Sequence, residues 1–428
     1  MLNVSKTGQE RVVIVGCGFA GLEMAKRLKK SNFQVVLIDK NNYHQFQPLF
    51  YQVATAGLEP RDISFPIRKL LHYQRNAVIR ITEVVRIIPE KKTLETTIGS
   101  LSYDHLVLAQ GAITSYFGLT NVEKFSQPMK SVLDALELLN TILHNLEDAL
   151  IGTNQEKLEE LTNIVIVGGG PTGVELSGAL AEMKHYVFPK DYPELDCSKI
   201  RIILIEASTK LLGGLSEISS VKAEKFLKKL GVEVMKETQV VDYDGSTILL
   251  KGKEAIKSRT LIWAAGIKGN VIQGFNQDVN TKSMRMVVDE FHRVKGYEDI
   301  FAIGDIACMV AEDRLQGHPQ VAQVAIQSAR NLARNLIKAK QGKSIKPFDY
   351  FDWGTMATIG RNKAVVDLKY LKFQGVLAWF TWMFIHLRSI FGAKNKILIL
   401  VNWMWSYITY DQSLRLTFLP RNFRFDKK

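Results

Sequence analysis

The chain is poor in the residues that build disulfide, thiol and metal centres. Its 428 residues include only three cysteines, with no C-x-x-C pair, at Cys17, Cys197 and Cys308. This odd number argues against a disulfide framework, a thiol redox pair and a cysteine zinc site. None of the eight histidines pairs at metal-ligand spacing, and no Ser/His/Asp or Cys/His arrangement has supporting spacing. We therefore expect no metal, and any redox chemistry must come from a bound cofactor.

Long apolar segments are also lacking. The first ten residues, MLNVSKTGQE, are polar, so no cleaved export signal is visible. Near the other end, the runs GVLAWFTWMFIHL and ILILVNWMWSYI span 13 and 12 residues, whereas a helix that spans a bilayer needs roughly 20. We expect neither run to cross a membrane, and hence no route for proton pumping.

The composition is that of a globular protein, and its positive charge is concentrated in one region. Hydrophobic residues make up 46% and charged residues 23% of the chain, and a chain of this length usually folds as two or three domains. The net charge is +13, and residues 361–428 alone contain 12 basic and 3 acidic side chains. The excess of positive charge therefore belongs to the C-terminal tail.

Two segments of the chain are copies of one pattern. RVVIVGCGFAGLEMAKRL begins at Arg11, and NIVIVGGGPTGVELSGAL begins at Asn163. In each copy an apolar run meets a glycine cluster and apolar residues then recur at helical spacing, which predicts a strand, a tight turn and a helix. A further strand follows each helix and ends in an acid, QVVLID at Asp39 and IRIILIE at Glu206. The chain thus contains two related α/β units.

Each copy carries the spacing G-x-G-x-x-G, at Gly16, Gly18 and Gly21 and at Gly168, Gly170 and Gly173. The first glycine allows a tight turn, the second lets the backbone approach a pyrophosphate, and the third lets helix and strand pack closely. The helix N-terminus adds the positive end of its dipole. Asp39 lies 18 residues after Gly21, close to the roughly 20 expected for an acid that binds a ribose hydroxyl. One such motif is weak evidence, but two copies with strand-end acids predict two bound dinucleotides.

The acid of the second copy favours NAD over NADP. Glu206 lies 33 residues after Gly173 because a longer crossover precedes its strand. A carboxylate at this position repels a 2'-phosphate and hydrogen-bonds a free 2'-hydroxyl. Lys210 lies nearby and weakens the preference, and an ordinary solvated strand-end acid is the alternative interpretation of Glu206.

The two dinucleotide motifs, the AQG segment at 109–111 and the AIGD segment at 302–305 together resemble the flavoprotein pyridine nucleotide oxidoreductases. Other segments are similar to the type II NADH dehydrogenases, the single-subunit NADH:quinone oxidoreductases: NNYHQFQPLFYQVAT, PTGVEL, PQVAQVAIQ, ATIGR and VNWMWSYITYDQSLRL. This resemblance spans nearly the whole chain. It implies an α/β fold with two dinucleotide-binding (Rossmann-like) domains, the second inserted in the first, and a C-terminal amphipathic helical membrane-anchoring region.

The resemblance also implies FAD as cofactor and NADH as substrate. It assigns the two parts of the FAD-binding domain to 1–125 and 285–350, the NADH-binding domain to 126–284 and the membrane-association region to 351–428. The residues implied for FAD are Gly16, Gly18, Phe19, Ala20, Gly21, Asp39, Lys40, Gln47, Gly111, Gly304 and Asp305. Those implied for NADH are Gly169, Gly170, Thr172, Gly173, Glu206, Ala265 and Gly266. Gln110 stands where the family has threonine, which leaves the local flavin contacts open.

Two further features concern the reaction. Glu175 lies just inside the second helix, where such enzymes carry an acid near the nicotinamide and the flavin ring; the alternative is an acid favoured only by the helix dipole. The segment PQVAQVAIQ matches the family's quinone-site motif through Ala322, Gln323 and Gln327. The two glutamines share one helical face, and their neutral amides can hydrogen-bond a quinone carbonyl. Without the resemblance, they would be interpreted as surface glutamines.

The tail combines aromatic and basic residues with its apolar runs. Indoles favour the headgroup zone of a membrane, and each cation near an anionic surface is worth about 1 kcal/mol. We expect the membrane contacts to come from Trp379, Trp382, Arg388, Lys394, Lys396, Trp403 and Trp405. On a helix, a narrow polar strip would be formed by Asn402, Ser406 and Thr409. Core helices or a dimer interface are alternatives, whereas nucleic-acid binding suits long aliphatic runs poorly.

These features predict a peripheral membrane flavoenzyme that oxidises NADH through FAD and reduces a membrane quinone without pumping protons. The expected location is the cytoplasmic face of a bacterial inner membrane, with the lipid surface and the quinone as partners, no nucleic acid, and a homodimer left open. Two alternatives stay open, a soluble NADH-dependent reductase of another acceptor and a FAD- and NADH-binding sensor with little turnover. Sulfide:quinone chemistry would need a cysteine pair at the flavin, of which the spacing gives no sign.

Overall fold

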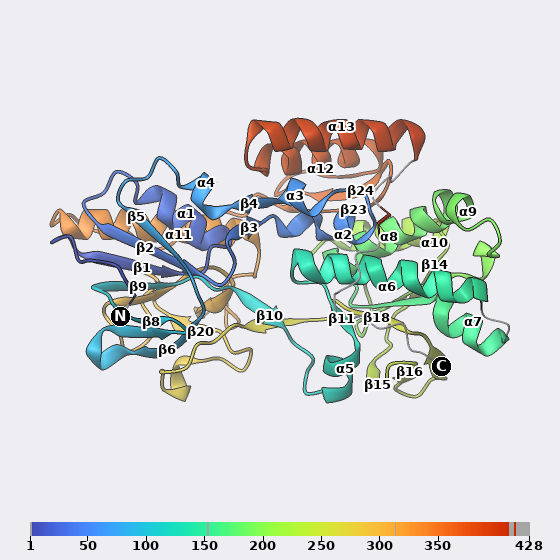
Figure 1. The fold of residues 1–428 in the computed structure, drawn as a ribbon, viewed down its shortest axis with the longest axis horizontal. Helices are drawn as coiled ribbons and strands as arrows, with labels where there is room; N and C mark the ends of the chain where they lie inside the picture. Colours follow the sequence, from blue (N-terminus) through green and yellow to red (C-terminus); the bar gives the residue numbers. More distant parts are fainter. Residues whose placement is uncertain (1, 152–153, 313, 411–414, 417–428) are drawn as a thin grey trace. The chain divides into compact units, whose positions relative to one another are not determined.

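The computed structural model describes residues 2–151, 154–312, 314–410 and 415–416, and Figure 1 follows the chain through its elements. The chain divides into two compact units, each assembled from separate segments. The first unit comprises Met1–Gln45, Phe65–Ile113 and Ile267–Asp352, and the second comprises Phe46–Ser64, Thr114–Gly266 and Trp353–Lys428. This division by packing differs from the boundaries expected above, because Phe46–Ser64 and the segment that begins at Trp353 pack with the second glycine motif.

The first unit is built around a parallel sheet of five strands in the order β21-β9-β1-β2-β5. Strand β1 is buried along its whole length, as the continuous apolar sequence of a strand covered on both faces predicts. Helices α1 and α11 pack against each other. Residues of the sheet and of an antiparallel sheet, β6-β7-β8, share one apolar core.

The elements assigned mainly to the first unit have the following bounds: β1 (Arg11–Val15), α1 (Phe19–Arg27), β2 (Gln34–Asp39), β3 (Tyr43–Gln45), β4 (Ser64–Pro66), α4 (Ile67–Leu70), β5 (Ala77–Ile81), β6 (Val84–Ile88), β7 (Thr93–Thr96), β8 (Gly99–Ser102), β9 (His105–Leu108), β10 (Ala112–Thr114), β19 (Ile267–Gly269), β20 (Met286–Val288), β21 (Ile300–Ala302), β22 (Ala307–Met309) and α11 (Ala322–Lys340).

The second unit repeats this plan with a parallel sheet in the order β11-β18-β12-β13-β14. The strand from Asn163 is again buried throughout, so the duplicated sequence pattern has given two sheets of the same kind. Ser131 caps helix α6, because its Oγ accepts a hydrogen bond from the Asp134 amide at 3.1 Å. A small antiparallel sheet, β15-β16-β17, lies in the same unit.

The elements of the second unit before its C-terminal part are α2 (Phe50–Ala54), α3 (Pro60–Ile63), α5 (Thr120–Phe125), β11 (Gln127–Pro128), α6 (Val132–Ile151), α7 (Gln155–Thr162), β12 (Asn163–Val167), α8 (Pro171–Tyr186), α9 (Phe188–Asp191), β13 (Arg201–Ile205), α10 (Glu217–Lys229), β14 (Val232–Met235), β15 (Val240–Tyr243), β16 (Thr247–Leu250), β17 (Ile256–Lys257) and β18 (Thr260–Trp263).

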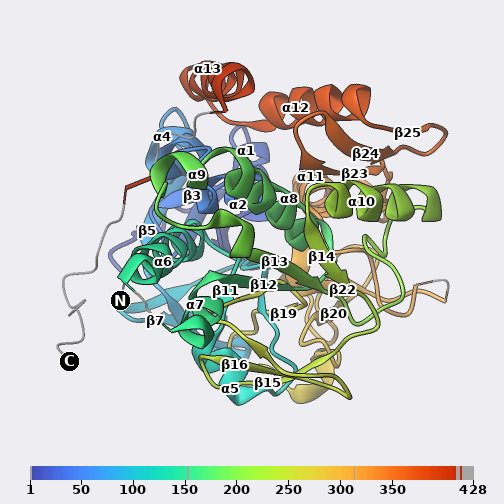
Figure 2. The same cartoon turned by 90° about the vertical axis from the view of Figure 1, so that its right-hand side faces the viewer.

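The C-terminal part of the second unit is an antiparallel sheet followed by two helices. Its elements are β23 (Thr355–Gly360), β24 (Lys363–Asp367), β25 (Lys372–Gln374), α12 (Val376–Ser389) and α13 (Ala393–Thr409). Figure 2 shows α12 and α13 beside each other, with α12 over β24 and β25. Strand β23 packs directly on α8, where a β-carbon on Gly178 would overlap the carbonyl oxygen of Ile359. Within the described ranges, no helix is long and apolar enough to cross a membrane.

Candidate active site

The first glycine loop is tightly packed at its first and third glycines and open at its second. Gly16 has a φ of 97°, and a β-carbon there would lie 2.5 Å from the carbonyl oxygen of Ala109. A β-carbon on Gly21 would overlap the carbonyl oxygen of Gly16, which lies in the preceding turn. A β-carbon on Gly18 meets no atom within 4 Å. The close packing therefore fixes the loop, while the backbone at Gly18 is left accessible to a ligand.

The second glycine loop has the same geometry. Gly168 has a φ of 114°, and a β-carbon there would lie 2.5 Å from the carbonyl oxygen of Ala264. A β-carbon on Gly173 would overlap the carbonyl oxygen of Gly168, and one on Gly170 meets nothing within 4 Å. Both loops therefore offer an uncovered backbone at the start of a helix, which suits a pyrophosphate.

Asp39 at the end of β2 is held against the first loop. Its carboxylate accepts hydrogen bonds from the amide of Cys17 at 2.6 Å and from the amide of Asn41 at 2.7 Å. Burial raises the pKa of Asp39, and the two amides partly offset this. The loop amides thus orient the Asp39 carboxylate. This position fits a contact between the carboxylate and the ribose of a nucleotide bound at the loop.

Glu206 directly after β13 repeats these contacts. It accepts from the amide of Gly169 at 2.6 Å and from the amide of Ser208 at 2.7 Å. These two residues occupy the positions that Cys17 and Asn41 occupy around Asp39. The ammonium of Lys210 lies 3.5 Å from the carbonyl oxygen of Leu215. The residues present therefore fit one dinucleotide at each loop, and the second acid suits a free 2'-hydroxyl.

Several other predicted FAD residues lie around the first loop. Gly304 packs against α1 and α11, since a β-carbon there would lie 3.1 Å from that of Ala20. The backbone oxygen of the following residue, Asp305, accepts from the Gln320 amide at 3.0 Å. Gln110, at the family's threonine position, donates to the carbonyl oxygen of Asn270 at 3.0 Å. The structure thus brings the AIGD segment to the first glycine helix, and it gives Gln110 a structural partner.

The remaining predicted nucleotide residues are dispersed. Phe19 packs edge-on against His44, with ring centroids 5.4 Å apart, and Lys40 is exposed next to Asp39. Gln47 begins a short 3-10 turn that belongs to the second unit. In the second unit, Thr172 is exposed in the first turn of α8, and a β-carbon on Gly266 would lie 2.5 Å from the ring of Phe117. Ala265 and Gly111 are each half-buried.

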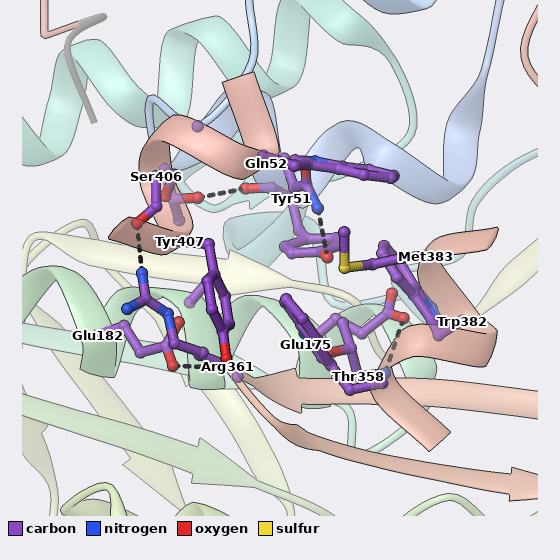
Figure 3. A pocket seen from close by; sticks show the side chains of 16 residues that line it. Tyr51, Gln52, Glu175, Glu182, Thr358, Arg361, Trp382, Met383, Ser406 and Tyr407 are labelled. Carbon is purple, nitrogen blue, oxygen red and sulfur yellow. Dashed lines mark hydrogen bonds between the residues drawn. The ribbon is translucent and has the colours of Figure 1, made fainter. Parts of the chain in front are cut away.

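A cavity of about 110 Å³ lies wholly within the second unit, between α2, α8, β23, α12 and α13 (Figure 3). Its lining combines two acids on α8 with aromatic residues from α2 and the two C-terminal helices. The acids are Glu175 and Glu182, and the aromatic residues are Tyr51, Trp379, Trp382, Trp403 and Tyr407. The cavity therefore combines aromatic walls with several convergent polar groups, as small-molecule sites usually do.

Glu175 is the buried acid of this cavity, with an exposed fraction of 8%. Burial raises its pKa to about 8, and the Thr358 amide, at 3.3 Å, and the Trp382 indole only partly offset this. The carboxyl group is therefore mainly protonated at pH 7 and can donate a hydrogen bond or a proton. The pKa of Glu182 is also raised by burial, and this acid accepts from the Arg361 amide at 2.6 Å.

Two family profiles match this chain. The profile described as "Pyridine nucleotide-disulphide oxidoreductase" matches residues 10–329, and the profile "NDH2 C-terminal domain" matches residues 353–409. Over 418 residues the chain is 35% identical to the Type II NADH:quinone oxidoreductase NdhA of Mycobacterium tuberculosis, which covers 94% of this chain and 88% of that protein. The chain belongs to the type II NADH:quinone oxidoreductases.

Other similarities agree with this family. The Type II NADH:quinone oxidoreductase of Staphylococcus aureus is 28% identical over 392 residues, covering 90% of this chain and 96% of that protein. The fold matches that of NDH2 from Plasmodium falciparum in complex with NADH, with a TM-score of 0.86 at 21% identity over 93% of this chain and 98% of that one. The C-terminal profile covers the strands and helices that close the cavity.

Gln327, predicted as a quinone ligand of this type II enzyme, has both ends of its amide engaged. Its nitrogen donates to the carbonyl oxygen of Phe351 at 2.8 Å, and its oxygen accepts from the amide of the same residue at 3.1 Å. Asn331 and Asn335 bind the neighbouring backbone at Lys346 in a similar way. Gln327 therefore holds the chain at Phe351 against α11. The motif residues Ala322 and Gln323 begin the same helix, in the first unit.

The predicted membrane tryptophans divide into two groups. Trp382 and Trp403 are buried, with exposed fractions of 2% and 9%, whereas 59% of Trp405 is exposed. We therefore correct the expectation for Trp382 and Trp403, which form a wall of the cavity because α12 and α13 fold back onto α2 and α3. Trp379 also lines the cavity and stacks on Tyr407 at 5.4 Å. The cations Arg388 and Lys394 are exposed and Lys396 is half-buried.

The expected polar strip on α13 faces the protein in part. Asn402 donates to the Asp62 carboxylate at 3.5 Å, and the carbonyl oxygen of Ser406 accepts from the Arg361 guanidinium. That guanidinium also lies over the ring of Tyr407 at 4.8 Å. The sequence reasoning missed Arg361 and the pair Tyr51–Gln52 as site residues, although the latter stands within the segment PLFYQVAT that carried the family resemblance.

Proposed function

We propose that this type II NADH:quinone oxidoreductase oxidises NADH with FAD in its first unit and reduces a membrane quinone, without moving protons across the membrane. The observation that carries the proposal is the duplicated glycine loop, in which each loop leaves its second glycine open and binds its own strand-end acid. Bound FAD would supply the two-electron chemistry that amino-acid side chains lack.

The chain's own residues would hold and orient the two nucleotides. We assign the loop from Gly16 to Gly21, with Asp39 and the Gly304–Asp305 turn, to FAD. We assign the loop from Gly168 to Gly173, with Glu206, to NADH. The engagement of both acids by loop amides supports this assignment, because the acids are fixed at the edge of each loop before a ligand arrives.

We assign the quinone ring to the cavity beside Glu175. Aromatic walls suit a flat apolar ring, and a protonated carboxyl group can donate to a quinone carbonyl, which gains negative charge and then protons on reduction. The pKa of Glu175, about 8, supports a proton-holding role at neutral pH. Gln323 stays a prediction of the sequence motif and takes no part in this assignment, whereas the paired amide of Gln327 favours a structural role for that residue.

The outer faces of α12 and α13 are proposed to rest on a lipid surface, at the cytoplasmic face of a bacterial inner membrane. They expose many large apolar side chains, including Leu377, Phe380, Phe384, Ile397, Val401, Met404, Trp405 and Ile408. So many exposed apolar side chains on two neighbouring helices are unusual for a monomeric protein unless they meet a partner or lipid. The exposed cations Arg388 and Lys394 lie at the adjoining helix ends, where they suit anionic headgroups.

The function is tested by following the flavin absorption of the purified protein. Anaerobic NADH should bleach the flavin band near its visible maximum, and ubiquinone-1 should restore it within the same experiment. A protein that carries no flavin, or that NADH does not reduce, would contradict the proposal. A flavin that NADH reduces but ubiquinone-1 does not reoxidise would instead identify an NADH-dependent reductase of another acceptor.

A further inference from the structure

The side-chain amide of Gln52 has a fixed orientation. Its oxygen accepts a hydrogen bond from the indole nitrogen of Trp403 at 2.8 Å. Because an indole N–H can only donate, the other end of the amide must be the NH₂ group. That group lies 2.8 Å from the hydroxyl oxygen of Tyr51 and donates to it. A residue of the C-terminal helix α13 thus determines the direction of a hydrogen bond within α2.

This arrangement leaves the Tyr51 hydroxyl with an unused hydrogen. The oxygen accepts from Gln52, and within the described part of the chain its hydrogen has no acceptor. The side chain is buried and its ring lines the same cavity as Glu175 (Figure 3). A buried hydroxyl hydrogen without an acceptor costs free energy. A ligand in the cavity that accepts this hydrogen would remove that cost.

We propose that Tyr51 is a second hydrogen-bond donor to the quinone in this cavity, and that Gln52 and Trp403 are positioning residues that direct its hydrogen toward the ligand. The inference rests on the proposed function, because it takes the ligand to be a quinone. A quinone carbonyl is an acceptor only, so it matches the donor that the Tyr51 hydroxyl would present to the cavity. The carbonyl oxygen becomes more negative on reduction, so the hydrogen bond strengthens during the reaction.

The test is the variant Tyr51→Phe, with Tyr73→Phe as its matched control, since Tyr73 is 81% exposed and lies outside the cavity. Three quantities are measured on the flavin-loaded proteins: stopped-flow flavin reduction by NADH, turnover with ferricyanide, and kcat and KM for ubiquinone-1. We expect Tyr51→Phe to lower kcat/KM for ubiquinone-1 on the order of 10-fold to 100-fold, as for a lost hydrogen bond to a group that gains charge. Flavin reduction and ferricyanide turnover should stay within about twofold of wild type, and the control should match wild type throughout.

The positioning role is tested by Trp403→Phe, which removes the indole N–H and lets the Gln52 amide turn over and accept the tyrosine hydrogen. It should lower kcat/KM for ubiquinone-1 in the wild-type background and have no further effect in the Tyr51→Phe background. Additive losses would overturn the positioning role. Unchanged quinone kinetics in Tyr51→Phe, or an equal loss of flavin reduction, would overturn the donor role. Failure of the wild type to reduce ubiquinone-1 would refute the proposed function itself, and this inference with it.

Discussion

Replacing Glu175 with glutamine should make the protein more resistant to unfolding, and increasingly so as the pH rises. In the folded chain, burial raises the pKa of Glu175 from its ordinary 4.5 to about 8. Between these two values the folded state keeps a proton that the unfolded state has released, so stability falls as the pH increases. Each pH unit in this window is worth about 1.4 kcal/mol, which amounts to about 4 kcal/mol between pH 5 and pH 8. Glutamine, which does not titrate, can still accept from the Thr358 amide and escapes this loss.

The assay is the midpoint of thermal unfolding of the wild type and of Glu175→Gln at pH 5, 6, 7 and 8. For a unit of roughly 250 residues, about 4 kcal/mol corresponds to a difference in Tm of about 10 °C, nearly absent at pH 5 and largest at pH 8. Glu254→Gln serves as the control, because Glu254 is exposed. If the Tm difference between the wild type and Glu175→Gln does not change with pH, Glu175 is not a protonated buried acid. That result would remove the support for its role as a proton donor.

Three further sets of substitutions distinguish residues that hold the fold together from residues that bind a ligand or lipid. Gly21→Ala should prevent soluble expression because its β-carbon overlaps the Gly16 carbonyl oxygen, whereas Gly18→Ala should fold and lose FAD on gel filtration; equal behaviour of the two variants would contradict the geometry of the loop. Gln327→Leu should increase deuterium exchange of amides 346–352 without any quinone present, and unchanged exchange would restore Gln327 as a simple quinone ligand. Trp405→Ala should weaken flotation with anionic liposomes several-fold, with Trp353→Ala, also exposed, as the control; equal loss in both would argue against lipid contact through α13.

The duplicated nucleotide-binding pattern could be predicted from the sequence because its determinants are local. Strand, glycine turn, helix and strand-end acid follow one another within a few dozen residues, and β2 does end at Asp39 and β13 just before Glu206. The close packing at the first and third glycines of each loop is likewise expected from the motif. Helix α6 begins directly after its capping residue Ser131, which is also a local effect because capping depends on the nearest few residues.

The cavity could not be predicted because it is assembled from segments that are far apart in the chain. Helical periodicity gives α13 several apolar faces, and only its contacts with α2 and α3 decide that Trp403 is covered and Trp405 is not. The pairing of Gln327 with Phe351 depends on a segment 24 residues further along the chain. In both cases the residue type indicated a possible role in binding, but tertiary packing determined which partner the side chain contacts.

The contact between Gly178 and Ile359 restricts which C-terminal segments can be combined with α8 in a hybrid protein. Because β23 lies against α8 with no room for a side chain, a hybrid that takes the segment 353–409 from a relative would fit only if its donor's helix also carries glycine at that point. Where the donor lacks that glycine, the tail and the nucleotide helix have to be grafted or redesigned together. An engineer who takes the two terminal helices from such a relative has to transplant α8 with them.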